Sequence, residues 1–167
     1  MERKKFLSLG VVAGAAILMP VTNLQAVNFR ETNAKAWEAE KSPEAIKAMF
    51  GDGKLNPTDK IKMTAPKLAE NGGSIPIRLK SDLDIETIAF FQDANPRSAT
   101  VVFSIPEGQK VNHSFRVKMR QSAFVTVVGK VRGTGELVQV KPREIDVSIG
   151  GCGGWFNPLP HFKTVIK

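Results

Sequence analysis

The residue with the clearest capacity for chemistry is Cys152, the only cysteine in a chain of 167 residues. It lies between two glycine pairs, in the run Gly150-Gly151-Cys152-Gly153-Gly154. Glycine allows backbone conformations that are closed to other residues, and it places no Cβ beside the thiol. The pattern therefore favours a thiol presented on a pliant segment that can enter the cleft of another protein. A structural cysteine in a glycine-rich turn is the alternative interpretation.

The surroundings of this thiol suit a carrier better than an enzyme. A free thiol has a reference pKa of about 8.5, so only a small fraction of it is thiolate at pH 7. The flanking run supplies no acid, base or oxyanion donor other than backbone groups, whereas a nucleophilic enzyme needs such groups. We therefore expect other proteins to modify Cys152, while the domain supplies attachment and delivery. A binding or assembly module that forms a mixed disulfide with a partner is a second possibility.

A copper site is a third chemistry that these residue types suggest. His113 and His161 together with Cys152 are ligand types of a blue-copper site, which also needs a weakly bound methionine. His161 lies nine positions after Cys152 and no methionine follows it, so the spacing argues against such a loop. We therefore predict no metal and no other cofactor, and interpret His113 as a solvated turn or strand-edge residue.

A short acidic stretch is the remaining candidate for catalysis. Asp82, Asp84 and Glu86 alternate with Leu83 and Ile85. Because side chains alternate between the two faces of a strand, the acids are most simply the solvated face of a strand or turn. Paired-acid catalysis is not indicated.

The first 26 residues have the three parts of an export signal. The cationic residues Arg3 to Lys5 precede an apolar run from Phe6 to Met19, and Leu24-Gln25-Ala26 offers small residues for cleavage before Val27. The apolar run is shorter than the roughly 20 residues that span a bilayer, so stable membrane insertion is not expected. We predict a periplasmic protein, exported by a twin-arginine-like or a general secretory route.

The charge balance favours anionic partners. Removal of residues 1–26 takes away three positive charges and one negative charge, which leaves +6 of the chain's net charge of +8. In an exported protein, such an excess favours small oxyanions or acidic proteins, and nucleic acid is not expected. Solubility alone explains the excess equally well.

The rest of the chain predicts a mostly β domain with a helical start. Helix formers occupy Thr32 to Glu40, and Ser42 then caps a second short helix with Pro43 at its first position and Gly51 as its stop. Seven or eight short strands follow and predict an antiparallel sandwich. The predicted strands are 60–64, 75–79, 85–91, 100–105, 114–119, 124–131, 136–140 and 144–149.

The predicted organisation has a single folded domain. Residues 1–26 are the signal peptide, 27–53 the helical lead-in and 54–149 the β-sandwich. Residues 150–154 are a glycine-rich carrier arm and 155–167 a C-terminal extension.

Several segments of the chain resemble the SoxY family, the sulfur-carrier subunits of the periplasmic Sox thiosulfate-oxidising system. The closing segment is the most specific of them, because it ends in the glycine-flanked cysteine. The segments are Phe50 to Gly53, Ala65 to Pro76, Asn95 to Arg97 and Val147 to Gly154.

This resemblance implies an immunoglobulin-like sandwich that pairs with a second small β-protein, SoxZ. It also implies that Cys152 carries the substrate covalently, with Gly150, Gly151, Gly153 and Gly154 as the flexible arm. In the family, the haem protein SoxAX joins thiosulfate oxidatively to the thiol, and SoxB then hydrolyses off sulfate. SoxCD oxidises the remaining sulfane sulfur where that enzyme is present.

One feature departs from the familiar members, in which the chain stops at or just after the second glycine pair. Here thirteen residues follow, Trp155 to Lys167, and several are aromatic or proline. An apolar tail of this kind is not expected to stay fully solvated. We expect the tail to be at most loosely attached, so that Cys152 stays accessible.

Overall fold

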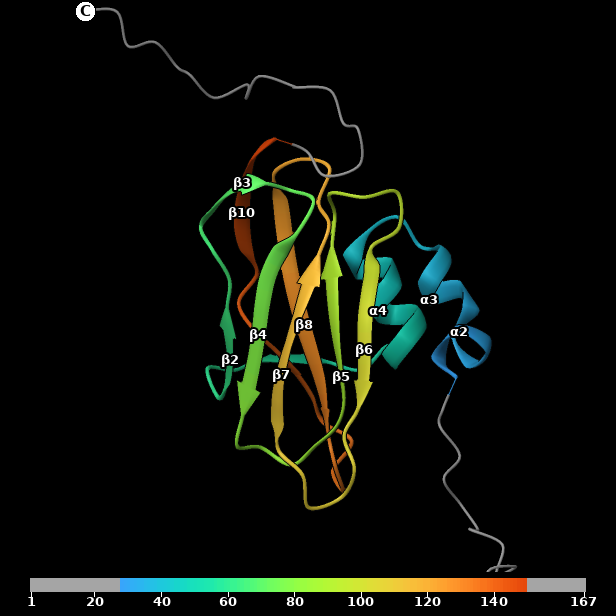
Figure 1. Ribbon diagram of the computed structural model, residues 1–167. Coiled ribbons are helices and arrows are strands. Elements are labelled where there is room, and N and C mark those ends of the chain that lie inside the picture. The colour runs from blue at the N-terminus through green and yellow to red at the C-terminus, as the bar shows by residue number, and fades with distance from the viewer. Residues whose placement is uncertain (1–27, 150–167) are drawn as a thin grey trace, which may run out of the picture.

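The computed structural model describes residues 28–149, which form a mostly β fold with short helices at its start (Figure 1). Its helices are α2 (Phe29–Thr32), α3 (Ala34–Glu38) and α4 (Ser42–Phe50). Its strands are β1 (Leu55–Pro57), β2 (Ile61–Thr64), β3 (Leu68–Asn71), β4 (Ile75–Ser81), β5 (Ile85–Gln92), β6 (Ala99–Ser104), β7 (Val111–Val117), β8 (Ala123–Val131), β9 (Leu137–Gln139) and β10 (Arg143–Ile149). No helix within residues 28–149 has the length and apolar character needed to cross a membrane.

The strands form two sheets. The smaller sheet has three strands in the order β2-β4-β7, all antiparallel. The larger sheet has seven strands and contains the path β1-β9-β8-β10-β3, with β5 paired to β8 and β6 paired to β5. The chain crosses from one sheet to the other several times, because consecutive strands such as β4 and β5 belong to different sheets.

The main hydrophobic core lies between the two sheets. Strand β4 alternates buried and exposed residues along its whole length, so Ile75, Ile77 and Leu79 face inward. They belong to one cluster with residues of the larger sheet such as Phe90 and Val127. Alternating strands of both sheets therefore supply the two faces of a common core.

A second core lies between the larger sheet and the helices. Helix α4 buries Ala45, Ile46 and Met49, which recur at helical spacing, against β5, β6 and β8. The smaller sheet covers one face of β5 and β8 and the helices cover the other, so these two strands are buried on both sides. This double burial explains why consecutive residues are buried at Phe90-Phe91 and from Val125 to Val128, where Thr126 is the one polar member.

The start of α4 differs from its prediction. Ser42 is the first helical residue rather than the residue before the helix, and its side chain does not cap it. Both its backbone N–H and its hydroxyl donate to Asp93 Oδ1, each at 2.8 Å, and its hydroxyl also lies 2.9 Å from Ser98 Oγ. A carboxylate from the β5–β6 turn therefore supplies the anionic partner that helix N-termini favour. The lead-in also contains three short helices where two were expected.

The prediction of a purely antiparallel sandwich was wrong in part. Within residues 28–149 two strands were missed, and both pair in parallel: β1 with β9 and β3 with β10. The sequences Leu55-Asn56-Pro57 and Leu68-Ala69-Glu70-Asn71 contain residue types that are uncommon in strands. Their extended form depends on pairing with a neighbour rather than on local preference. The eight predicted strands were all found, with shifted ends.

We predict that Phe90→Ala lowers the free energy of unfolding by about 3 to 5 kcal/mol, because a buried ring is replaced by a cavity. Phe90 is 1% exposed and packs edge-on against Phe115, with the ring centroids 5.6 Å apart. Urea unfolding measures the change. Phe124→Ala is the matched control, because Phe124 is 54% exposed and its loss should change stability by less than about 0.5 kcal/mol. Equal losses in both variants would contradict this account of the core.

Candidate functional site

The candidate site is the end of β10, because this strand leads directly into the glycine run. Strand β10 has two partners in succession. Its first half pairs antiparallel with β8, where Glu144 lies opposite Phe124, and its second half pairs in parallel with β3, where Ile149 lies opposite Asn71. Each half of the strand is therefore held by a different neighbour, and its last residue is part of the sheet.

Hydrogen bonds from neighbouring loops fix the second half of β10. The backbone N–H of Asp146 donates to Lys67 O at 2.9 Å, and that of Val147 donates to Ser122 Oγ at 2.9 Å. Nearer the start of the strand, Arg143 Nη2 donates to Ala65 O at 3.1 Å. These contacts attach β10 to the segments before β3 and before β8, and so determine where the chain leaves the sheet.

The turn between β3 and β4 is part of the same end of the molecule. Asn71 Oδ1 accepts the N–H of Gly73 at 2.7 Å, and Gly72 O accepts the N–H of Met119 at 2.8 Å. A Cβ on Gly73 would lie 2.9 Å from Asn71 Oδ1, so a larger residue here would displace the Asn71 side chain from this hydrogen bond. The turn thus joins β3, the partner of Ile149, to the segment that follows β7.

Two exposed apolar side chains flank β10 on one face of the larger sheet. Leu68 is 57% exposed and lies opposite Asp146, and Phe124 is 54% exposed and lies opposite Glu144. Directly paired residues point to the same face of a sheet, so Leu68, Phe124 and the two acids share the outer surface of this region. Large apolar side chains left exposed beside a functional element are candidates for contact with a partner.

Cys152 and its four glycines, Gly150, Gly151, Gly153 and Gly154, lie outside the described residues, as do the predicted signal peptide, the C-terminal extension and His161. The structure therefore places the root of the predicted arm and not the thiol. Ser122, which holds that root, was not singled out from the sequence, because a serine in a turn carries no distinguishing pattern.

Within residues 28–149, His113 does not belong to a site with other ligand types. It lies on β7, an edge strand of the smaller sheet, so the strand-edge position is confirmed, whereas the expectation of a solvated residue is not, because the side chain is half-buried. Its ring stacks on Phe103 with the centroids 4.3 Å apart, and its Nε2 atom is buried without a hydrogen-bond partner among the described residues. No group of three or more His, Cys, Asp and Glu side chains within residues 28–149 could hold a metal ion.

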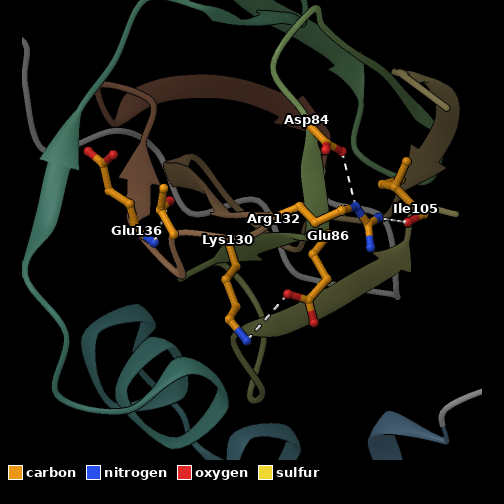
Figure 2. Close-up of polar contacts among 7 residues, drawn as sticks. Asp84, Glu86, Ile105, Lys130, Arg132 and Glu136 are labelled. Atoms are coloured by element: carbon orange, nitrogen blue, oxygen red, sulfur yellow. Dashed lines mark hydrogen bonds and ion pairs between the residues drawn. The ribbon is translucent and has the colours of Figure 1, made fainter. Parts of the chain in front are cut away.

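The acids that alternate before and along β5 form ion pairs, as Figure 2 shows for two of them. Asp84 Oδ1 lies 3.1 Å from Arg132 Nε, and Glu86 Oε2 lies 3.5 Å from Lys130 Nζ. Arg132 also donates through Nη2 to the carbonyl of Ile105, which ties β8 to the end of β6. The interpretation of these acids as a solvated face is confirmed. Such exposed pairs contribute little to stability.

The described residues therefore form a mostly β protein whose last strand pairs with β8 along its first half and with β3 along its second half, and precedes a cysteine between glycine pairs. A fixed strand followed by a glycine-flanked thiol is the arrangement that the sequence predicted for a carrier.

The sequence model of the family described as sulfur oxidation protein SoxY matches residues 46–152. This match covers more than half of the 167 residues, and the chain belongs to the SoxY family. It contains all the segments on which the resemblance was based except the final Gly153 and Gly154. Members of this family are carrier proteins of the Sox sulfur-oxidation system and not enzymes. The partners of such a carrier are, in general, the other proteins of that system.

A solved structure of the sulfur carrier protein SoxY from Chlorobium limicola f thiosulfatophilum is 29% identical and has a TM-score of 0.57, with coverage of 64% of this chain and 96% of that chain. A superoxide reductase (neelaredoxin) from Ignicoccus hospitalis is 14% identical with a TM-score of 0.48, covering 56% of this chain and 94% of that chain. Fibronectin(III)-like modules of CbhA from Clostridium thermocellum are 13% identical with a TM-score of 0.38, covering 52% of this chain and 93% of that chain. The last two likenesses are too distant to bear on function. No curated protein sequence matches the chain.

We predict that Ser122→Ala loosens the end of β10, because it leaves the N–H of Val147 without its protein partner. The expected loss of stability is about 0.5 to 1.5 kcal/mol, with faster hydrogen exchange at the amide of Val147. Ser148→Ala is the control, since Ser148 is exposed on the same strand, and it should leave that exchange rate unchanged. Slow exchange at Val147 in both variants would show that the hydroxyl does not hold the strand.

Proposed function

We propose that this protein holds intermediates of periplasmic thiosulfate or reduced-sulfur oxidation covalently on Cys152 and presents them to partner enzymes. The observation that carries the proposal is the extent of the family match, in which the only cysteine of the chain is the last matched residue. The geometry supports it, because β10 is firmly held up to a point three residues before that cysteine.

The chemistry of loading is an oxidation performed by a partner. The Cys152 thiol and thiosulfate join through a new sulfur–sulfur bond, which releases one proton and two electrons. The haem protein SoxAX is the proposed electron acceptor, and the product is a cysteine S-thiosulfonate. Hydrolysis by SoxB then adds one water, releases sulfate and two protons, and leaves a persulfide anion on the cysteine. Where SoxCD is present, that enzyme would oxidise the remaining sulfane sulfur.

The contribution of this chain is position and reach. Ile149 is paired in the sheet, and the three residues from Ile149 to Cys152 span at most about 10 Å when extended. The proposed arm, Gly150 to Gly154, would allow the thiol to enter a narrow channel with little steric resistance. A fixed root and a short glycine arm keep the thiol close to the domain that the partners recognise.

The remaining parts of the proposal concern assembly and location. We infer that the two sheets form an immunoglobulin-like sandwich and that SoxZ is the heterodimer partner. The exposed Leu68 and Phe124 beside β10 offer apolar surface of the kind that stable subunit contacts use. We further infer that removal of residues 1–26 accompanies export to the periplasm. A mixed disulfide between Cys152 and a partner protein is the alternative function.

We predict that Cys152→Ser abolishes sulfur loading. The mature protein is incubated with thiosulfate and SoxAX, and intact-mass spectrometry follows the adduct. The wild type should gain the mass of sulfur and oxygen atoms, and the variant none. The double variant Cys152→Ser/Ser148→Cys is the matched control, because it moves the same thiol four residues back onto β10, and its loading should be at least about tenfold slower. A protein-sized disulfide in place of the small adduct would support the alternative.

We predict that truncation after Gly154 changes the loading rate by less than about twofold. The physical reason is that a loosely attached tail leaves the reach of a glycine arm unchanged. The rate is measured with thiosulfate and SoxAX for the full mature chain and for the truncated chain. A large gain on truncation would show that residues 155–167 restrict the thiol.

A further inference from the structure

The outer face of the smaller sheet carries positive charge without any acid. The residues that point outward from β2, β4 and β7 include Lys62, Arg78, Lys80 and Arg116, and all four are exposed. The strands of this sheet contain no aspartate or glutamate at any position. We call these four side chains the basic face.

The strand register brings these cations close together. Lys62 lies directly opposite Lys80, while Arg116 lies opposite Pro76 and is a diagonal neighbour of Arg78. Side chains directly opposite each other have Cβ atoms only about 4.5 to 5.5 Å apart, and like charges in such pairs are destabilising. The fold therefore carries a repulsion here that a single neutral or acidic residue would remove.

Protection against aggregation does not account for the basic face. Charged residues on edge strands prevent unwanted pairing, and this explains Lys62 on β2 and Arg116 on β7. Arg78 and Lys80, however, lie on β4, the central strand of the sheet, where no edge is exposed. The four ion pairs of the described residues lie elsewhere, and the one nearest to this sheet, Lys110 with Asp82, lies beyond the strand ends.

The basic face is uncovered within residues 28–149. Figure 1 shows the helices beside the larger sheet, while β2, β4 and β7 form the opposite side. A hollow of about 540 Å³ lies on this face, and its lining includes Pro66, Pro76, Arg78 and Arg116. It offers two guanidinium groups beside apolar ring surface, which suits the carboxylate of a protein side chain.

The charge continues to the end of the molecule where the arm begins. Arg116 Nη1 donates to Ser74 O and Ser74 Oγ, each at 3.3 Å, in the turn that follows β3. Arg116 also borders a groove of about 670 Å³ whose lining includes Arg97, Lys118 and Arg120 and no carboxylate. Since β3 pairs with β10 up to Ile149, a protein bound on the basic face would lie near the root of the arm.

We propose that the basic face docks an acidic surface of an enzyme that acts on the carrier arm, an inference that rests on the proposed function. A single small oxyanion does not match four charges that extend about 13 Å along β4. A permanent subunit is also a poor match, because stable interfaces exclude charge from their centre. Charged complementary surfaces instead accelerate association.

The test compares two triple variants of the mature protein purified with SoxZ. Lys62→Gln/Arg78→Gln/Lys80→Gln removes three of the four positive charges of the basic face, and Lys35→Gln/Lys41→Gln/Lys54→Gln removes the same charge from exposed positions in and around the helices. Association rates with purified SoxAX and SoxB are measured between about 50 and about 500 mM NaCl, because salt screens exposed charges. Neutralising the basic face should slow association with at least one enzyme about tenfold at low salt and flatten its salt dependence. The control variant should stay within about twofold of the wild type.

The outcomes separate docking from folding. Loss of the Lys62 and Lys80 repulsion predicts a Tm equal to or above that of the wild type, so slower association would not reflect unfolding. Lys80→Glu should raise the Tm further, because it places a carboxylate opposite Lys62, and should still slow association. Equal rates for both triple variants with both enzymes would overturn the proposal.

If SoxZ, a lipid surface or nucleic acid binds the basic face instead, the same variants give different results. Loss of SoxZ from the basic-face variant alone would assign the face to the subunit interface and overturn the proposal. Basic-face-dependent binding to phosphatidylglycerol vesicles or to duplex DNA, with enzyme association unchanged, would also overturn it. The proposed function is tested separately, because all variants retain Cys152: a wild type that thiosulfate and SoxAX do not load would refute the carrier role whatever the docking rates.

Discussion

The successive pairing of β10, first with β8 and then with β3, is the constraint on which the rest of this structure depends. Ile145 is fully buried in the main core, and the strand on which it lies pairs with β8 on one side and β3 on the other. The second half of β10 pairs with β3 alone, and a strand end with one partner frays readily because its terminal hydrogen bonds compete with water. The additional bond from Val147 to Ser122 and the turn around Asn71 extend order up to the last residue before the glycine run. The described part of the chain is therefore held in place up to the point where the glycine run begins.

The layering of the fold decides which surfaces remain available. Helix α4 covers the outer side of β5, β6 and β8 and buries residues such as Ala89 and Val128. That side is thereby used for stability, and it explains why these strands carry apolar residues on both faces. The smaller sheet has only one buried face, so its strands alternate strictly and its outward positions are free to carry charge. The separation of a covered side from a charged side follows from the placement of the helices.

Much of this arrangement could be predicted from the sequence, and the failures have physical causes. The alternation from Ile75 to Leu79 predicted β4 correctly, because side-chain period alone determines such a strand. Strand β3 was missed because Leu68-Ala69-Glu70-Asn71 has no strand pattern and becomes extended only by pairing with β10. The partner of Ser42 was also out of reach, since Asp93 lies 51 positions further along the chain. For the site, the glycine-flanked Cys152 was evident from the sequence, whereas Ser122 and the pairing of Lys62 with Lys80 required the register of strands that are distant in sequence.

A carrier that serves several enzymes in turn must bind each of them quickly and leave each of them quickly. Exposed charges meet the first demand, because long-range attraction raises the association rate while contributing little to the lifetime of a complex. The proposed glycine arm would meet the second, because a flexible segment loses more conformational entropy when it is ordered in a cleft, and this loss weakens the bound state. A rigid, apolar interface would have the opposite effect and would retain the carrier on its first enzyme. On this argument, the repulsion that the fold tolerates between Lys62 and Lys80 and the entropy of the glycine run serve the same end, which is rapid transfer between partners.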